Sequence, residues 1–82
     1  MRTRKQALGD KNIVGARIEK KRKELGMKQI ELLAQLQIEG IDLTASGLSK
    51  LEGQLRCVND YELVAIAKIL GVSLDWLVGL EN

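Results

Sequence analysis

The sequence predicts an all-α protein, a single compact domain built from five short helices. Its 82 residues are enough for one domain and leave no room for a second. The chain contains no proline and only short runs of β-branched residues, which disfavours a sheet. Apolar residues instead recur at helical spacing in segments separated by glycine. With no Phe, one Trp and one Tyr, the small core must be aliphatic, and a dimer partner would add stability.

The first helix is expected after a basic N-terminal segment. Residues 1–11 are polar and basic, so we expect a flexible arm there, followed by a folded domain over residues 12–82. Asn12 is a suitable N-cap for a helix that runs to about Leu25. Gly26 then supplies the left-handed conformation that often ends a helix.

The second and third helices are separated by an irregular stretch. Helical spacing of apolar residues predicts a second helix over about residues 28–37. Residues 38–43 break that period and contain a glycine, so they are interpreted as the connection. Thr44 is a good N-cap for a third helix, Ala45–Glu52, whose inner side would carry Leu48 and Leu51.

Two further helices begin at recognisable capping signals. Asn59 and Glu62 have the spacing of a capping box and predict the start of a fourth helix, which Gly71 closes. Ser73 is suited to cap a short fifth helix that contains Leu74, Trp76, Leu77 and Val78.

Charge is distributed unevenly along the chain. Residues 1–41 contain ten Lys and Arg against five Asp and Glu, whereas residues 42–82 contain three against six. The excess suggests a basic face for a polyanion toward the N-terminal side. A solvated, lysine-rich helix surface explains the same excess equally well.

Composition argues against several classes of site. Without histidine and with Cys57 as the single cysteine, one chain cannot assemble a zinc cluster, a disulfide framework or a Cys–His nucleophile. We find no phosphate-cradling glycine loop and no plausible carboxylate pair, so we expect no enzyme activity, cofactor or small-molecule ligand. No apolar stretch approaches the ~18 residues of a membrane span, and an unpaired thiol is typical of a reducing cytoplasm.

Several short groups of residues occur in a fixed order along the chain. They are Val14–Ile18, Arg22–Met27, Gln29 to Ala34, Leu48–Glu52, Arg56 and Leu63–Leu77. Together they resemble the Cro and phage-repressor-type (XRE family) domains over about residues 13–80. The resemblance implies a lambda-repressor-like fold in which the second and third helices form a helix-turn-helix. It also implies a bacterial or phage-encoded transcriptional regulator that binds double-stranded DNA at the nucleoid.

The third helix is the candidate for reading DNA. A major groove admits one α-helix and displays an unambiguous pattern of donors and acceptors, so the reading helix must expose small and polar side chains. The outer positions of the third helix and its cap meet that need, whereas an ordinary surface helix would show a similar polar side. The candidate DNA-contacting residues are Thr44, Ala45, Ser46, Ser49 and Lys50.

The resemblance implies further roles for residues outside the third helix. Gln29, at the start of the second helix, matches a glutamine that contacts a DNA phosphate, and Lys28 replaces the usual cap but its charge suits the same phosphate. Arg17 and Arg56 are further candidates for phosphate contacts, with plain solvated charges as the alternative. Three arm residues could enter a minor groove, although a disordered tail is the preferred interpretation: Arg2, Arg4 and Lys5.

Arg22 and Glu52 match a partly buried ion pair that positions the reading helix in related repressors. The main departure from the family lies between the second and third helices. Ala34 and Leu48 are fourteen positions apart, several more than is usual, so the tight turn would be loosened or replaced by an extra helical turn. Gly47 lies inside the reading helix, where it lowers helix propensity and would permit a close approach to DNA.

The sequence therefore predicts a DNA-binding repressor that acts as a homodimer on a two-fold related operator. The dimer interface is expected in the C-terminal helix, which is more apolar than one packed face requires. Its candidate residues are Leu74, Trp76, Leu77, Val78 and Leu80. A protein-interaction module of the same fold, such as an antitoxin or an adaptor, is the alternative.

Overall fold

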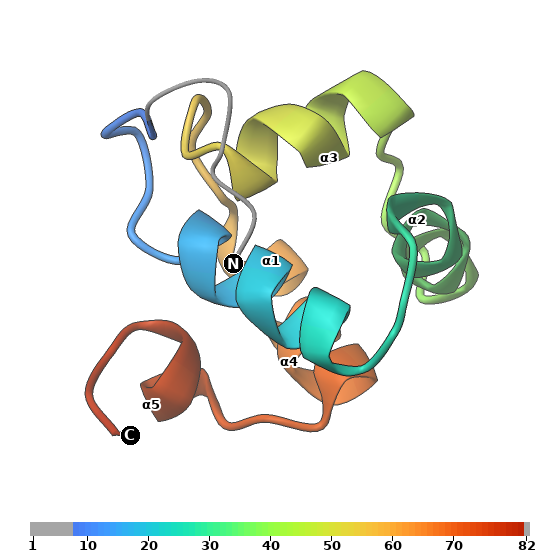
Figure 1. The fold of residues 1–82 in the computed structure, drawn as a ribbon. Coiled ribbons are helices and arrows are strands. Elements are labelled where there is room, and N and C mark those ends of the chain that lie inside the picture. Colours follow the sequence, from blue (N-terminus) through green and yellow to red (C-terminus); the bar gives the residue numbers. More distant parts are fainter. Residues whose placement is uncertain (1–7, 82) are drawn as a thin grey trace.

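The computed structural model describes residues 8–81 and forms, over that range, five helices and no strands (Figure 1). This confirms the predicted all-α, five-helix fold. The helices are α1 (Gly15–Glu24), α2 (Gln29–Ile38), α3 (Ala45–Glu52), α4 (Asp60–Leu70) and α5 (Leu74–Leu77).

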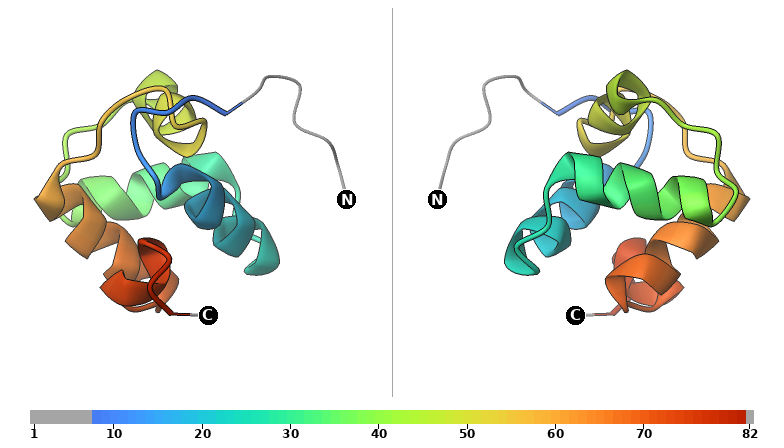
Figure 2. Two further views of the ribbon diagram at one scale, coloured as in Figure 1. Left: turned by 90° about the vertical axis from the view of Figure 1, so that its left-hand side faces the viewer. Right: turned by 90° about the vertical axis from the view of Figure 1, so that its right-hand side faces the viewer.

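Helix α3 lies on one side of the molecule and packs on α1 and α2, while α4 and α5 lie on the opposite side (Figures 1 and 2). All five helices contribute aliphatic side chains to one core. Such a core fixes the helices relative to one another without any aromatic cluster. Its fully buried apolar side chains are Ile18, Leu32, Leu36, Leu48, Leu51, Ile66 and Leu77.

The first helix begins later than predicted. Its N-cap position is Val14, and Asn12 lies two residues before it. The Asn12 side-chain oxygen still accepts hydrogen bonds from the backbone N–H groups of Val14 and Gly15, at 3.1 and 2.9 Å. Its amide group donates to the carbonyl oxygens of Leu51 and Arg56, at 3.1 and 2.8 Å. Asn12 therefore joins the start of α1 to the end of α3, a role that a helix cap alone does not predict.

Residues 9–11, at the end of the predicted arm, make hydrogen bonds with the loop that follows α3. Gly9 N donates to the Gly53 carbonyl at 2.9 Å, and Lys11 N donates to the Gln54 carbonyl at 3.0 Å. The Gln54 side chain returns two bonds, to the carbonyls of Gly9 and Asn12, at 3.3 and 2.8 Å. Residues 9–11 are thus fixed against the loop that follows α3, and the folded part starts before residue 12. The arm residues Arg2, Arg4 and Lys5 lie outside the described residues.

The long connection between α2 and α3 is neither loose nor helical. Ile41 and Leu43 are buried in the core, with 7% and 9% of their surface exposed. Gly40 reverses the chain with a φ of 86°, and Ile41 N donates to the Leu36 carbonyl at 2.9 Å. The extra residues therefore pack as part of the domain, which corrects the expectation of a loosened turn or an added helical turn.

The later helices begin and end at the predicted signals. Asn59 N donates to the Glu62 carboxylate at 2.9 Å at the start of α4, and Gly71 ends that helix with a φ of 69°. The Ser73 hydroxyl accepts from Trp76 N at 3.0 Å at the start of α5. These signals act over three residues, which is why the sequence alone locates them.

Candidate nucleic-acid interface

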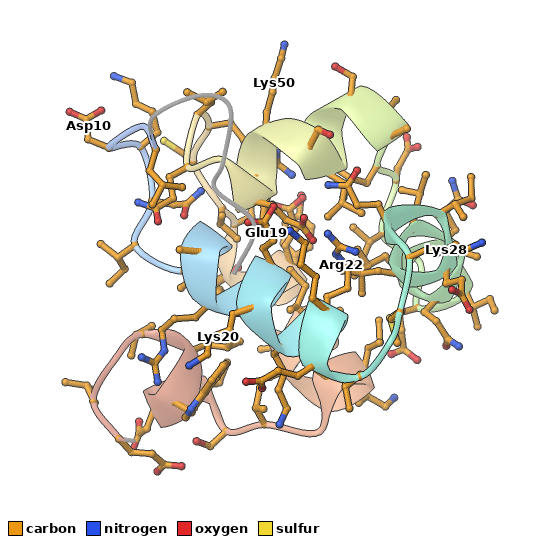
Figure 3. The ribbon with its side chains drawn as sticks, viewed as in Figure 1. Asp10, Glu19, Lys20, Arg22, Lys28 and Lys50 are labelled. Carbon is orange, nitrogen blue, oxygen red and sulfur yellow. The ribbon has the colours of Figure 1, made fainter. Side chains whose placement is uncertain are left out.

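The outer side of α3 is exposed, since no other part of residues 8–81 covers it. Leu48 and Leu51 on its inner side are fully buried. The five candidate residues of its outer side and cap are exposed: Thr44, Ala45, Ser46, Ser49 and Lys50. Lys50 projects away from the body of the protein, beyond α3 (Figure 3). The helix thus has the two-sided character that insertion into a groove requires, with an apolar inner side and small or polar outer residues.

The N-terminus of α3 is fixed by its cap. The Thr44 hydroxyl accepts a hydrogen bond from Gly47 N at 3.0 Å. A Cβ atom added to Gly47 would lie 3.0 Å from a Leu43 methyl carbon and 3.2 Å from the Thr44 hydroxyl. The packing around Gly47 is therefore against side-chain atoms of its own preceding residues, Leu43 and Thr44.

The C-terminal end of α3 is held by a buried ion pair. Arg22 on α1 donates to both carboxylate oxygens of Glu52, at 2.7 and 3.0 Å, and to the Met27 carbonyl at 2.8 Å. Both side chains are nearly inaccessible, with 9% and 1% of their surface exposed. Because a guanidinium and a carboxylate match in two parallel bonds, the pair fixes orientation as well as distance.

Gln29 extends this ion pair to the surface of α3. Its side-chain amide donates to Glu52 at 2.8 Å, and its amide oxygen accepts from the Ser49 hydroxyl at 3.2 Å. A continuous chain of hydrogen bonds therefore links Arg22, inside the protein, to Ser49, on the outer side of α3. Sequence reasoning missed the contact between Gln29 and Ser49 because the two residues are twenty positions apart on different helices.

Lys28 is exposed at the N-terminus of α2 and points outward from it (Figure 3). The Lys28 side chain does not cap the helix. The Glu31 carboxylate instead accepts a hydrogen bond from Lys28 N at 2.9 Å, so one backbone N–H at the start of α2 is satisfied by a side chain.

Arg17 does not lie with the α3 residues. Its guanidinium group lies 4.3 Å from the centre of the Trp76 ring and donates to the carbonyls of Trp76 and Glu81, at 2.6 and 3.1 Å. These partners belong to α5 and the residues after it, on the side of the molecule opposite α3 (Figure 1). In this structure, Arg17 therefore anchors the C-terminal segment, and its expected phosphate contact stays a prediction.

Arg56 is neither a free loop charge nor part of the outer side of α3. It donates to the Gly47 carbonyl at 3.2 Å, to the Cys57 carbonyl and to both oxygens of Glu62, at 3.2 and 2.7 Å. Its side chain is 24% exposed and that of Glu62 only 6%. Arg56 therefore connects the middle of α3 to the first turn of α4.

The Arg56–Glu62 pair makes stability depend on pH. Burial raises the pKa of the Glu62 carboxyl, but the hydrogen bonds from Arg56 and Asn59 and the Arg56 charge lower it by more, so the pKa lies below its ordinary value of 4.5. A lowered folded-state pKa contributes stability above the unfolded-state pKa, and this stability is lost as pH falls through the folded value.

Glu62→Gln should therefore be less stable than the wild type at pH 7, and this difference should shrink as pH falls below about 4.5. Urea unfolding of both proteins between pH 3 and 7 measures it. Parallel pH profiles for the two proteins would exclude this role of Glu62.

Basic residues of the N-terminal half lie on more than one side of the fold. Lys20 on α1 points toward the side of α5, away from Lys50 (Figure 3). Lys23 lies 4.0 Å from Glu19 on the same helix. In the C-terminal half, Lys68 on α4 pairs with Glu39 at 3.0 Å. The described basic residues are therefore not confined to the surface around α3.

None of the helices within residues 8–81 combines the length and apolar character needed to cross a membrane. The same residues contain no group of three acidic or cysteine side chains placed to hold a metal ion.

Comparison with known proteins identifies a family. A family model described as helix-turn-helix matches residues 18–77, from the first turn of α1 to the end of α5. No curated protein and no solved structure matches the chain. The matched range includes α2, the connection and α3 in full.

Proposed function

This chain belongs to the helix-turn-helix family of the XRE and lambda-repressor type, a DNA-binding family, and we propose from that premise that it represses transcription by binding a specific duplex sequence through α3. The supporting observation is the exposed, small and polar outer side of α3 on a fully buried apolar base. Repression needs only occupancy of a promoter, which a DNA-binding domain supplies by itself.

We assign the contacts by position on α3. Ser46 and Lys50 are proposed to hydrogen-bond base edges, and the Ala45 methyl group suits contact with a thymine methyl. Ser49 joins them through its hydroxyl, whose orientation Gln29 fixes. Phosphates are proposed to bind at Thr44 and at the N-terminus of α2, where the Lys28 charge and the positive end of the helix dipole attract an anion.

The proposed active form is a homodimer on a two-fold related operator. Leu74 and Leu80 are 45% and 78% exposed, and Trp76 and Val78 are half-buried at the edge of the core. Leu77 is removed from the proposed interface, because it is fully buried within its own protomer. Two half-sites about 34 Å apart would place both copies of α3 on one side of the duplex. The protein is proposed to act in the cytoplasm of a bacterium.

The test begins with selection of bound duplexes from a random pool. The double variant Ser46→Ala, Lys50→Ala should lose at least about tenfold in affinity for the selected site, since a good base contact contributes about 1–3 kcal/mol of discrimination. Circular dichroism and the melting temperature should hardly change, because both side chains are exposed. Lys20→Ala is the matched control, because it also removes an exposed lysine, but one on α1 that points away from Lys50 (Figure 3). Unchanged affinity of the double variant would show that α3 is not the reading helix.

A further inference from the structure

The segment of residues 9–11 lies beside the end of α3 and is held there by the backbone. Gly9 N and Lys11 N donate hydrogen bonds to the carbonyl oxygens of Gly53 and Gln54, the two residues directly after the helix. A Cβ atom on Gly9 would lie 2.3 Å from the Gln54 carbonyl oxygen, so this close approach requires glycine. Figure 1 shows the segment running alongside the loop that follows α3.

The length of α3 indicates what this segment would meet. Eight residues of helix span about 12 Å. The major groove of B-DNA is also about 12 Å wide. A helix of that length inserted across the groove places its C-terminal end, and anything attached there, close to the phosphates of a groove wall.

Residues 9–11 present charged side chains at that position. Asp10 and Lys11 are both exposed. Asp10 projects from the same end of the molecule as Lys50, away from α4 and α5 (Figure 3). The backbone bonds fix the base of the Lys11 side chain, so less conformational entropy is lost when its ammonium group binds an anion.

We propose that Lys11 is a DNA-backbone contact, and that the Gly9–Gln54 attachment positions it against a phosphate beside the site read by α3. This inference rests on the proposed function. It assigns to Lys11 a contribution that is independent of base sequence, whereas Ser46 and Lys50 discriminate between sequences. Asp10 opposes the same phosphate and moderates the affinity.

The experiment compares two duplexes of equal length, the selected site and a random sequence, with the full chain at 50 and 200 mM salt. Lys11→Ala should weaken binding to both duplexes by a similar factor. The magnitude of the slope of log affinity against log salt should fall by about 0.9. The ratio of wild-type to variant affinity should therefore be about 3.5-fold smaller at 200 mM salt than at 50 mM salt. Lys20→Ala, the control, should leave the slope unchanged.

Two further variants separate this contact from general effects. Asp10→Asn should strengthen binding to both duplexes at 50 mM salt, a change opposite in sign to that of Lys11→Ala. Gly9→Ala retains every charge but displaces the segment from Gln54, so it should reproduce the weakening seen with Lys11→Ala. Helical content, measured by circular dichroism, should stay at the wild-type level in both.

The outcomes distinguish the two proposals. If the wild type shows no preference for a selected duplex, the proposed function fails. If the wild type discriminates but Lys11→Ala keeps its affinity and salt slope, the inference about Lys11 alone is overturned. A Lys11→Ala loss confined to the selected site would also overturn it, because a phosphate contact cannot depend on base identity.

Discussion

Replacing Glu52 by alanine is expected to lower the free energy of unfolding by about 3–5 kcal/mol, because Arg22 would remain buried without its counter-charge. The total stability of a domain of this size is only about 4–12 kcal/mol, so the loss is a large share of it. Urea denaturation followed by circular dichroism measures the change. The matched control is Glu39→Ala, which breaks the more exposed pair with Lys68 and should cost at most about 1 kcal/mol.

A paired substitution separates stability from positioning. In the double variant Arg22→Met, Glu52→Met, both charges are replaced by apolar groups, so most of the stability should return. Gln29 would still lose its bond to Glu52, and affinity for the selected duplex should remain reduced. Recovery of both stability and affinity would contradict a positioning role for the pair.

The second large effect is expected at Gly15, where α1 passes closest to α3. A Cβ atom there would lie 2.3 Å from the Leu51 carbonyl oxygen and 2.7 Å from that of Glu52. Because both obstacles are backbone atoms, Gly15→Ala must push the two helices apart, at an expected cost of about 2–3 kcal/mol. Thermal and urea unfolding measure this cost, and duplex affinity should fall with it.

The control for Gly15 is the same substitution on a neighbouring helix. Gly47→Ala meets only side-chain atoms of Leu43 and Thr44, at 3.0 and 3.2 Å, which can shift. Its gain in helix propensity of about 1 kcal/mol offsets much of the remaining crowding. Equal destabilisation by the two substitutions would show that the contact between α1 and α3 is not the limiting one.

Much of the fold follows from signals that act over a few residues. The Thr44 and Ser73 caps and the terminal glycines Gly26 and Gly71 locate helix ends because each acts on its own first or last turn. The inner side of α3 is equally predictable, since Leu48 and Leu51 stand at helical spacing. The Arg22–Glu52 pair was predicted only through the resemblance to a family, because its partners are thirty residues apart.

The parts of the site that sequence reasoning missed depend on contacts between distant segments. Arg17 and Arg56 carry the charge expected of phosphate contacts, but their partners, the Trp76 ring and the Glu62 carboxylate, are defined only after the chain has folded. The attachment of Gly9 to Gly53 involves backbone groups, which every residue has. The pattern of side chains along the sequence therefore does not predict this backbone hydrogen bond.

The buried pair Ile41 and Leu43 has a consequence for how this fold tolerates change. Since these two side chains pack the end of the inter-helix connection into the core, the chain is attached to the interior directly before α3 begins. We therefore expect a change of length near Gly40 to preserve the orientation of α3 only where Ile41 and Leu43 both keep their places in the core.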